Sequence, residues 1–308
     1  MSDAICSRRD ILTAGALGIA ATLSPAVARA QEQKSASIPA RSDAPLPPVL
    51  KTSLAGYSFR EYLDKPGKPG KMSLMDLADY SARLRIDAFE PTFYYFLRYD
   101  DEWIYALKRH IFLTGLEVSC TPNNNNFAKP VSEQEPEREK IRNSVDWAVK
   151  LGSPAIRVFA GAPVKGVERE EAFRNVVEGM KHVAEYAAKR GVFLALENHG
   201  YLTEMADDVL RIVDAVDNEW LAVNLDSGNF RDNTYAEFAK LAPRAVTCQF
   251  KIAVNEGGQR LPADFNRLAR ILREANYRGY VALEYEGADP FGEVPGYIEK
   301  LKAALQSA

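Results

Sequence analysis

Three absences limit what this 308-residue chain can be. It contains only three cysteines, Cys6, Cys120 and Cys248, which is too few for a fold held together by disulfides. It has no excess of positive charge, because 39 basic residues face 42 acidic ones, and this argues against a nucleic-acid partner. It shows no internal repeat, and its 46% hydrophobic and 26% charged residues are ordinary for a globular protein.

The first thirty residues have the pattern of an export signal. Arg8 and Arg9 precede an apolar run over 11–23, and Ala-Arg-Ala over 28–30 supplies a small-residue cleavage site. This order is typical of a bacterial twin-arginine signal, which predicts a periplasmic location. The apolar run is shorter than the roughly 20 residues of a membrane span, so no span is expected. The alternative is an ordinary amphipathic N-terminal helix.

The expected mature chain has two parts. Residues 31–51 are polar and proline-rich, which predicts a flexible linker. Residues 52–308 are expected to form the folded domain. Cys120 and Cys248 would remain there as buried free thiols, although an oxidising compartment leaves a disulfide open.

From residue 52 onward, short apolar runs alternate with longer helical patterns. Strands are expected over 53–59, 86–91, 116–121, 155–159, 192–197, 221–226, 245–252 and 279–285. Helices are expected over 74–84, 102–113, 137–151, 170–189, 206–216, 235–241, 262–275 and 294–305. Eight such units in about 250 residues predict an α/β fold with a single (β/α)8 TIM barrel. A doubly wound open sheet usually has a Gly-rich turn after its first strand, and none follows Phe59.

Polar side chains stand at the ends of the last four expected strands. These ends are Glu197-Asn-His199, Asn224-Leu-Asp226, Gln249-Phe-Lys251 and Glu284-Tyr-Glu286. The C-terminal ends of barrel strands converge, and alternate residues of a strand share a face. Glu197, Asp226, Gln249 and Glu284 would then form an oxygen-rich pocket suited to Mg²⁺ or Mn²⁺. The alternative is that each is a solvated loop residue or an ion-pair partner.

The same segments resemble a known family. They are Ala195-Leu-Glu-Asn-His-Gly200, Val223-Asn-Leu-Asp-Ser-Gly228, Cys248-Gln-Phe-Lys251, Gly279-Tyr-Val-Ala-Leu-Glu284 and Ile156-Arg-Val-Phe-Ala-Gly161. Together they resemble the sugar phosphate isomerase/epimerase family, whose fold is a xylose isomerase-like barrel. The resemblance implies Glu197, Asp226, Gln249 and Glu284 as metal ligands, with Gln249 standing where many members have histidine. The family also includes DNA-repair endonucleases that bind several zinc ions, but this chain has only three histidines.

The resemblance also implies a chemistry for these residues. A proton is moved next to a carbonyl through an enediolate, with Glu197 and Glu284 as the acid/base pair. Lys251 would stabilise the developing oxyanion, and His199 would donate to a substrate hydroxyl or shuttle a proton. Glu90 and Asn123 are expected to bind the substrate together with His199 and Lys251. The alternatives are a structural His199 and a surface Lys251.

The leading interpretation is therefore a divalent-metal-dependent isomerase or epimerase acting on a small sugar or keto-sugar. One alternative is a periplasmic 3-keto-glycoside lyase or dehydratase, which would eliminate a β-substituent from the same enediolate. Another is a non-catalytic sugar-binding protein. The sequence is also compatible with a homo-oligomer. The aromatic cluster over 93–103 is expected to pack in the core or to form a dimer contact, with a saccharide platform as its alternative.

Overall fold

The computed structural model describes residues 48–307. The expected export signal, and the expected linker up to residue 47, lie outside the described residues. The linker was expected to run to residue 51, but strand β1 begins at Val49. Its first three residues pair with Arg278, Gly279 and Tyr280, so they belong to the folded domain.

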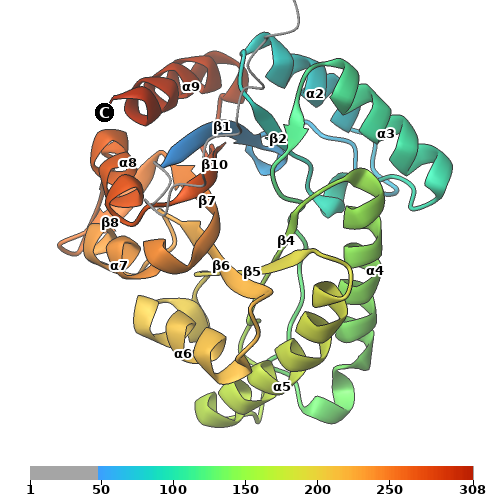
Figure 1. The fold of residues 1–308 in the computed structure, drawn as a ribbon, viewed down its shortest axis with the longest axis vertical. Helices are drawn as coiled ribbons and strands as arrows, with labels where there is room; N and C mark the ends of the chain where they lie inside the picture. The colour runs from blue at the N-terminus through green and yellow to red at the C-terminus, as the bar shows by residue number, and fades with distance from the viewer. Residues whose placement is uncertain (1–47, 308) are drawn as a thin grey trace, which may run out of the picture. The chain divides into compact units, whose positions relative to one another are not determined.

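Eight parallel strands form the central sheet (Figure 1). They are β1 (Val49–Ala55), β2 (Ala88–Glu90), β3 (Glu117–Val118), β4 (Ala155–Val158), β5 (Phe193–Glu197), β6 (Leu221–Asp226), β7 (Ala245–Lys251) and β10 (Arg278–Glu284). Their order is β3-β2-β1-β10-β7-β6-β5-β4. Two further backbone bonds join the ends of this order, because the N–H of Thr121 donates to Ala155 and that of Asn123 donates to Arg157. The sheet thus closes on itself, and the predicted (β/α)8 barrel is confirmed.

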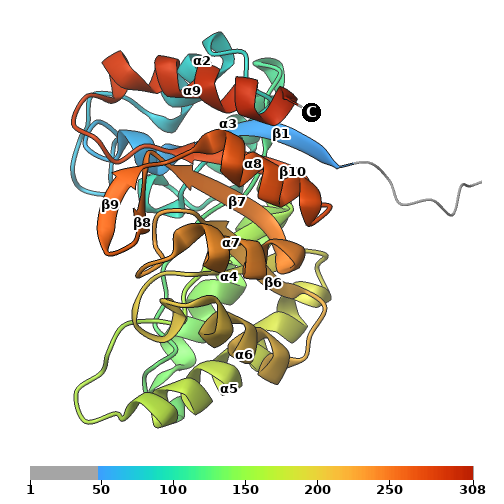
Figure 2. The same ribbon diagram turned by 90° about the vertical axis from the view of Figure 1, so that its left-hand side faces the viewer.

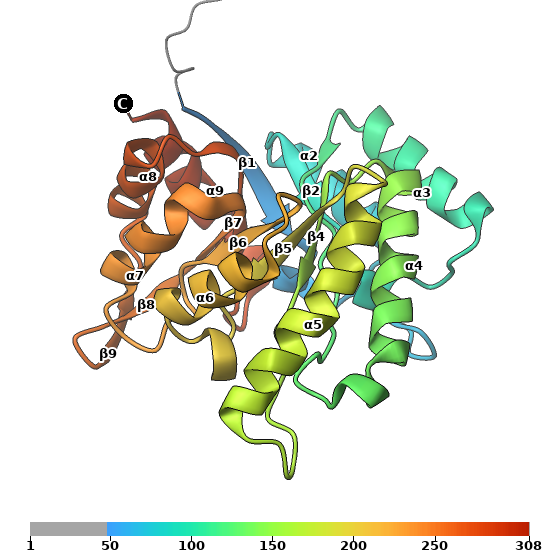
Figure 3. The ribbon, with the colours of Figure 1, turned by 60° about the horizontal axis from the view of Figure 1, so that its bottom comes forward.

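One helix follows each strand and covers the outside of the barrel (Figure 2; Figure 3). The helices are α2 (Leu74–Arg83), α3 (Asp101–Leu113), α4 (Glu135–Leu151), α5 (Arg169–Ala188), α6 (Ala206–Val216), α7 (Thr234–Leu241), α8 (Phe265–Glu274) and α9 (Pro290–Gln306). In α6, Val209, Ile212, Val213 and Val216 recur at helical spacing and are buried against the sheet. No helix within residues 48–307 is long and apolar enough to cross a membrane.

A β-hairpin follows β7 and was missed by the sequence reading. Strands β8 (Ala253–Glu256) and β9 (Gln259–Pro262) pair antiparallel around Gly257 and Gly258. Both glycines have positive φ, as a tight two-residue hairpin turn requires. The expected helix over 262–275 therefore starts only at Phe265.

Cys120 and Cys248 are buried and free, as expected of structural thiols. Burial raises the pKa of both thiols well above its usual range. Both groups are therefore held as neutral thiols, which react slowly.

Candidate active site

The polar strand ends meet at the C-terminal mouth of the barrel. Strand register sets Asp226 beside Gln249, and Lys251 beside Glu284. These four side chains and Glu197 are all at least nine-tenths buried. Buried polar groups are costly unless they are paired, so their contacts indicate what this mouth is built to do.

A chain of hydrogen bonds runs across the mouth from β2 to β4. Glu90 Oε2 accepts from Gln249 Nε2 at 2.7 Å, and Gln249 Oε1 accepts from Asn224 Nδ2 at 2.9 Å. The same Asn224 Nδ2 donates to Glu197 Oε2 at 3.2 Å. Arg157 Nη1 completes the chain, 2.7 Å from Glu197 Oε2. The amide of Gln249 therefore links the Glu90 carboxyl to the amide that supports Glu197.

Lys251 is surrounded by carboxylates. Its Nζ lies 2.8 Å from Glu284, 2.9 Å from Glu286 and 3.5 Å from Asp226, and its side chain is only 5% exposed. Burial lowers the pKa of Lys251, but the three carboxylates outweigh it and hold the pKa well above its usual range. Burial alone would raise the pKa of Glu284, but the effect of Lys251 is larger, so the pKa of Glu284 is lowered. The alternative of a surface lysine is wrong.

In two other buried carboxyls the effect of burial is larger than the effect of neighbouring charges. Asp226 Oδ1 accepts from the N–H of Gly228 at 2.7 Å, but Oδ2 has no hydrogen-bond partner. Burial raises the pKa of Asp226 well above its usual range. Burial also raises the pKa of Glu90 to about 8, and Glu90 Oε1 has no partner. The mouth is short of positive charge.

The other predicted binding residues lie at the edge of this cluster. His199 is exposed, and its ring centroid is 4.4 Å from that of Phe159. Asn123 turns its side-chain amide to Ser144 of α4. Asn123 contacts the mouth through its backbone carbonyl oxygen, which accepts a hydrogen bond from Arg157 Nε at 3.2 Å.

Residues 78–307 match the protein family described as the xylose isomerase-like TIM barrel. The chain belongs to this family. Over 182 residues the chain is 25% identical to a 2-oxo-tetronate isomerase of Haemophilus influenzae. This match covers 54% of this chain and 67% of that protein.

Solved structures share the same fold. One is a 3-keto-D-glucoside 4-epimerase of E. coli, with a TM-score of 0.65 and 17% identity over 82% of this chain and 99% of that one. Another is a D-psicose 3-epimerase of Clostridium cellulolyticum H10, with a TM-score of 0.64 and 17% identity over 83% of this chain and 96% of that one. At these identities the likeness concerns the architecture.

The oxygen set of this xylose isomerase-like barrel fits a hard divalent cation. Asp226 Oδ2 is buried without a hydrogen-bond donor, and Glu197, Glu284 and the Gln249 amide add further oxygen donors. Such ligands suit Mg²⁺ or Mn²⁺. Within residues 48–307, no group of three or more His, Cys, Asp or Glu side chains is already arranged to hold a metal. The fit rests on this oxygen, which accepts no hydrogen bond, and on the number of buried oxygen donors around it.

The amide run over 123–126 closes the barrel. Asn125 Oδ1 accepts from the N–H of Phe159 at 2.8 Å, and its Nδ2 donates to the Phe159 carbonyl at 2.6 Å. Asn126 Nδ2 donates to the carbonyl of Ala162 at 3.3 Å. These side chains therefore extend the backbone pairing between the loops after β3 and β4.

We expect Asn125→Ala to destabilise this barrel. The substitution leaves a partly buried N–H and C=O of Phe159 unpaired, at a cost of about 1–3 kcal/mol. Chemical denaturation measures this cost. Asn124→Ala is the matched control, because Asn124 is exposed and its loss should change the unfolding free energy by less than about 0.5 kcal/mol. Equal costs would contradict the closing role of Asn125.

The aromatic cluster after β2 packs in the core, as expected. Phe93, Tyr95 and Phe96 are at most 3% exposed. The Tyr99 ring stacks on Trp147 of α4, with centroids 4.0 Å apart. The cluster thus joins the loop after β2 to α4, with Tyr99 still 40% exposed.

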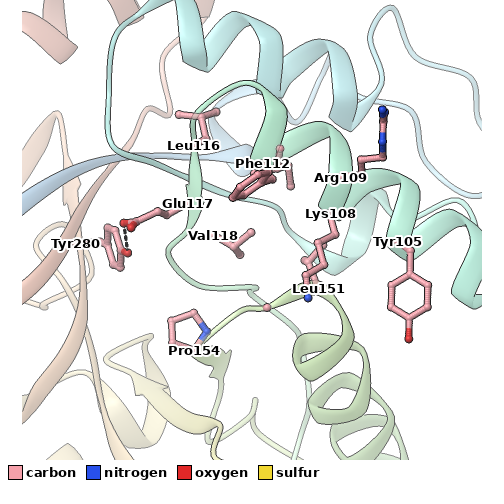
Figure 4. A pocket seen from close by; sticks show the side chains of 12 residues that line it. Tyr105, Lys108, Arg109, Phe112, Leu116, Glu117, Val118, Leu151, Pro154 and Tyr280 are labelled. Carbon is pink, nitrogen blue, oxygen red and sulfur yellow. Dashed lines mark hydrogen bonds between the residues drawn. The ribbon is translucent and has the colours of Figure 1, made fainter. Parts of the chain in front are cut away.

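A cavity lies at the opposite end of the barrel (Figure 4). It measures about 640 Å³ and is lined by the last turns of α3 and by Glu117, Pro154 and Tyr280 near the strand starts. Its lining is mostly apolar, with no converging set of carboxylates. In barrels of this kind, chemistry takes place at the other end of the strands, so the active site is assigned to the C-terminal mouth.

The sequence reading missed two contributors to the mouth. Asn229 Nδ2 donates to Glu197 Oε1 at 2.8 Å. Tyr94 accepts from Arg157 Nη2 at 2.8 Å. Both residues follow strand ends by several positions, where no apolar periodicity indicates the direction of a side chain. Arg157, inside one of the segments that carry the family resemblance, supplies the cationic partner of Glu197.

Proposed function

We propose that this barrel is a divalent-metal-dependent sugar isomerase or epimerase. The observation that supports it is the pair of buried carboxylates, Glu197 on β5 and Glu284 on β10, beside the buried Asp226. Two carboxylates with different partners suit a reaction that removes a proton and then returns it. The names of the relatives, which include isomerases and epimerases, agree with this chemistry.

The metal would be held by Glu197, Asp226, Gln249 and Glu284, and Mn²⁺ or Mg²⁺ is favoured because every donor is oxygen. When bound, the metal would polarise a sugar carbonyl and make the neighbouring C–H more acidic.

Side chains of the protein carry out the remaining steps. One carboxylate of the Glu197 and Glu284 pair removes the proton, and the other returns it. Lys251, which is already charged beside Glu284, stabilises the negative charge that develops on the substrate oxygen. His199, at the rim, donates to a substrate hydroxyl. Glu90 is held largely protonated at neutral pH, since its pKa is raised to about 8, and a protonated carboxyl can donate a hydrogen bond.

We expect removal of the metal to abolish turnover. Dialysis against EDTA should lower the isomerisation rate by about 100-fold or more, because the metal contributes several kcal/mol to the transition state. Adding Mn²⁺ or Mg²⁺ should restore the rate, and adding K⁺ at the same ionic strength should not. Metal analysis before and after dialysis shows whether an ion was removed. Full activity in metal-free protein would contradict the proposed metal dependence.

A 3-keto-glycoside lyase is the second candidate, because a cavity opens beside Glu197 where a leaving group would fit. The same proton abstraction would then be followed by loss of a β-substituent. NMR of the products separates the two reactions: a sugar epimer or isomer indicates the first, and a released aglycone indicates the second. A non-catalytic sugar-binding role leaves the two buried carboxylates without a purpose.

A further inference from the structure

A second cavity, of about 560 Å³, opens beside the carboxylate pair. The loops after β3, β4, β5 and β6 form its walls. The side chains that bear on its chemistry are Phe159, Ala162, Pro163, His199, Tyr201 and Asn229. Among these residues only His199, at the rim of the mouth, has a role in the proposed reaction.

The cavity borders the mouth, because two of its lining residues contact the carboxylates. Asn229 lines it and donates to Glu197 Oε1 at 2.8 Å. The Phe159 ring lies under the Arg157 guanidinium, at 4.2 Å, and this guanidinium pairs with Glu197. Gly228 also lines the cavity, and its N–H holds Asp226 Oδ1. A sugar placed at the carboxylates would therefore extend any substituent into this space.

His199 is the one ionisable side chain with a charge near neutral pH among the described residues that line the cavity. The lining includes no Lys, Arg, Asp or Glu. The amides of Asn125 and Asn126 are already bound to backbone groups, which leaves few free polar atoms. A phosphate would lose its hydration here and would find no Lys or Arg side chain in the lining, only the imidazole of His199.

Aromatic and small residues shape the space that remains. The Phe159 and His199 rings lie with their centroids 4.4 Å apart and 41° between their planes. Tyr201 adds a third ring, and Ala162 and Gly200 keep the wall open. Flat apolar walls of this kind bind another ring by stacking and by burial of apolar surface.

We propose that this cavity binds the uncharged aglycone ring of a glycoside whose sugar carries a keto group, so that the substrate is a keto-glycoside and not a free monosaccharide or a sugar phosphate. The inference rests on the proposed function, because it takes the sugar to lie at Glu197 and Glu284.

Calorimetric titration of the Mn²⁺-loaded full chain tests this. The probes are matched phenyl and methyl β-glycosides of glucose, galactose and xylose, together with glucose 6-phosphate. For at least one sugar, the phenyl glycoside should bind about 10-fold more tightly than the methyl glycoside, because its ring buries more apolar surface. Glucose 6-phosphate should bind more weakly than either.

Two variants at one exposed position complete the design. Ala162→Trp fills the cavity from its rim and should remove the preference for the phenyl glycosides. Ala162→Ser should keep it, and thermal melting shows that both variants are folded. Equal binding of every matched pair, no binding of any phenyl glycoside, tighter binding of the phosphate, or a preference that survives Ala162→Trp would each overturn the proposal. Because these are binding data, they can succeed even if the chain turns over no sugar, which would sink only the proposed function.

Discussion

Glu197→Gln and Glu284→Gln should each reduce turnover by about 10²- to 10⁴-fold, the range that a positioned general acid or base contributes. The change replaces a carboxylate with an amide of nearly the same shape, so both variants should remain folded. Each should also bind Mn²⁺ less tightly, because a charged ligand is lost. Initial rates on the accepted sugar, with circular dichroism as the test of folding, measure this.

The matched control is Glu286→Gln. Glu286 also contacts Lys251, at 2.9 Å, but its side chain is 37% exposed. Its loss should change turnover by less than about 10-fold, because Lys251 keeps the Glu284 carboxylate as its closer partner. Full turnover by both Glu197→Gln and Glu284→Gln would show that neither residue transfers the proton.

Arg157→Met should have the largest effect on stability. Arg157 is the cationic partner of a Glu197 carboxylate that is 1% exposed, and removing one partner of a buried ion pair costs about 3–5 kcal/mol. Burial disfavours the charged guanidinium, but Glu197 outweighs it and the pKa of Arg157 is raised above its ordinary value. Chemical denaturation of the variant measures the loss.

Two further variants separate this effect from lost packing. The double variant Arg157→Met with Glu197→Gln should recover part of the loss, because no charge is then left buried alone. Arg211→Met breaks a similar Arg–carboxylate pair with Glu170, but there both side chains are exposed. It should cost less than about 1 kcal/mol. Equal losses for Arg157→Met and Arg211→Met would show that the buried pair has no special role.

The regular part of the fold was predictable because strands and helices alternate eight times along the chain. Each strand and helix gives its own local apolar pattern, and the strands β6 and β5 agree with the expected ranges to within a residue. The helix α6 agrees at both ends. The polar strand ends were also visible, because a carboxylate after a buried run is unusual.

The contacts that complete the barrel were not predictable in the same way. Asn125 bonds to Phe159 across 34 residues, and no local pattern encodes such a pairing. The hairpin of β8 and β9 lies between an expected strand and an expected helix and was not predicted, although its Gly-Gly turn is a local signal. The hydrogen bonds of Gln249 to Glu90 and Asn224 depend on rotamers that only the assembled mouth determines. The metal role of Gln249 remains a prediction.

Exchange of a substrate proton with solvent tests the central claim most directly. A panel of ketoses and keto-glycosides is incubated in D₂O with the Mn²⁺-loaded full chain, and proton NMR follows the hydrogen next to the carbonyl. We predict deuterium at that carbon in at least one substrate, and no exchange with the Glu197→Gln and Glu284→Gln variants. Exchange that persists in both variants would contradict the assigned acid/base pair, and the absence of exchange in every substrate would contradict the enzymatic function itself.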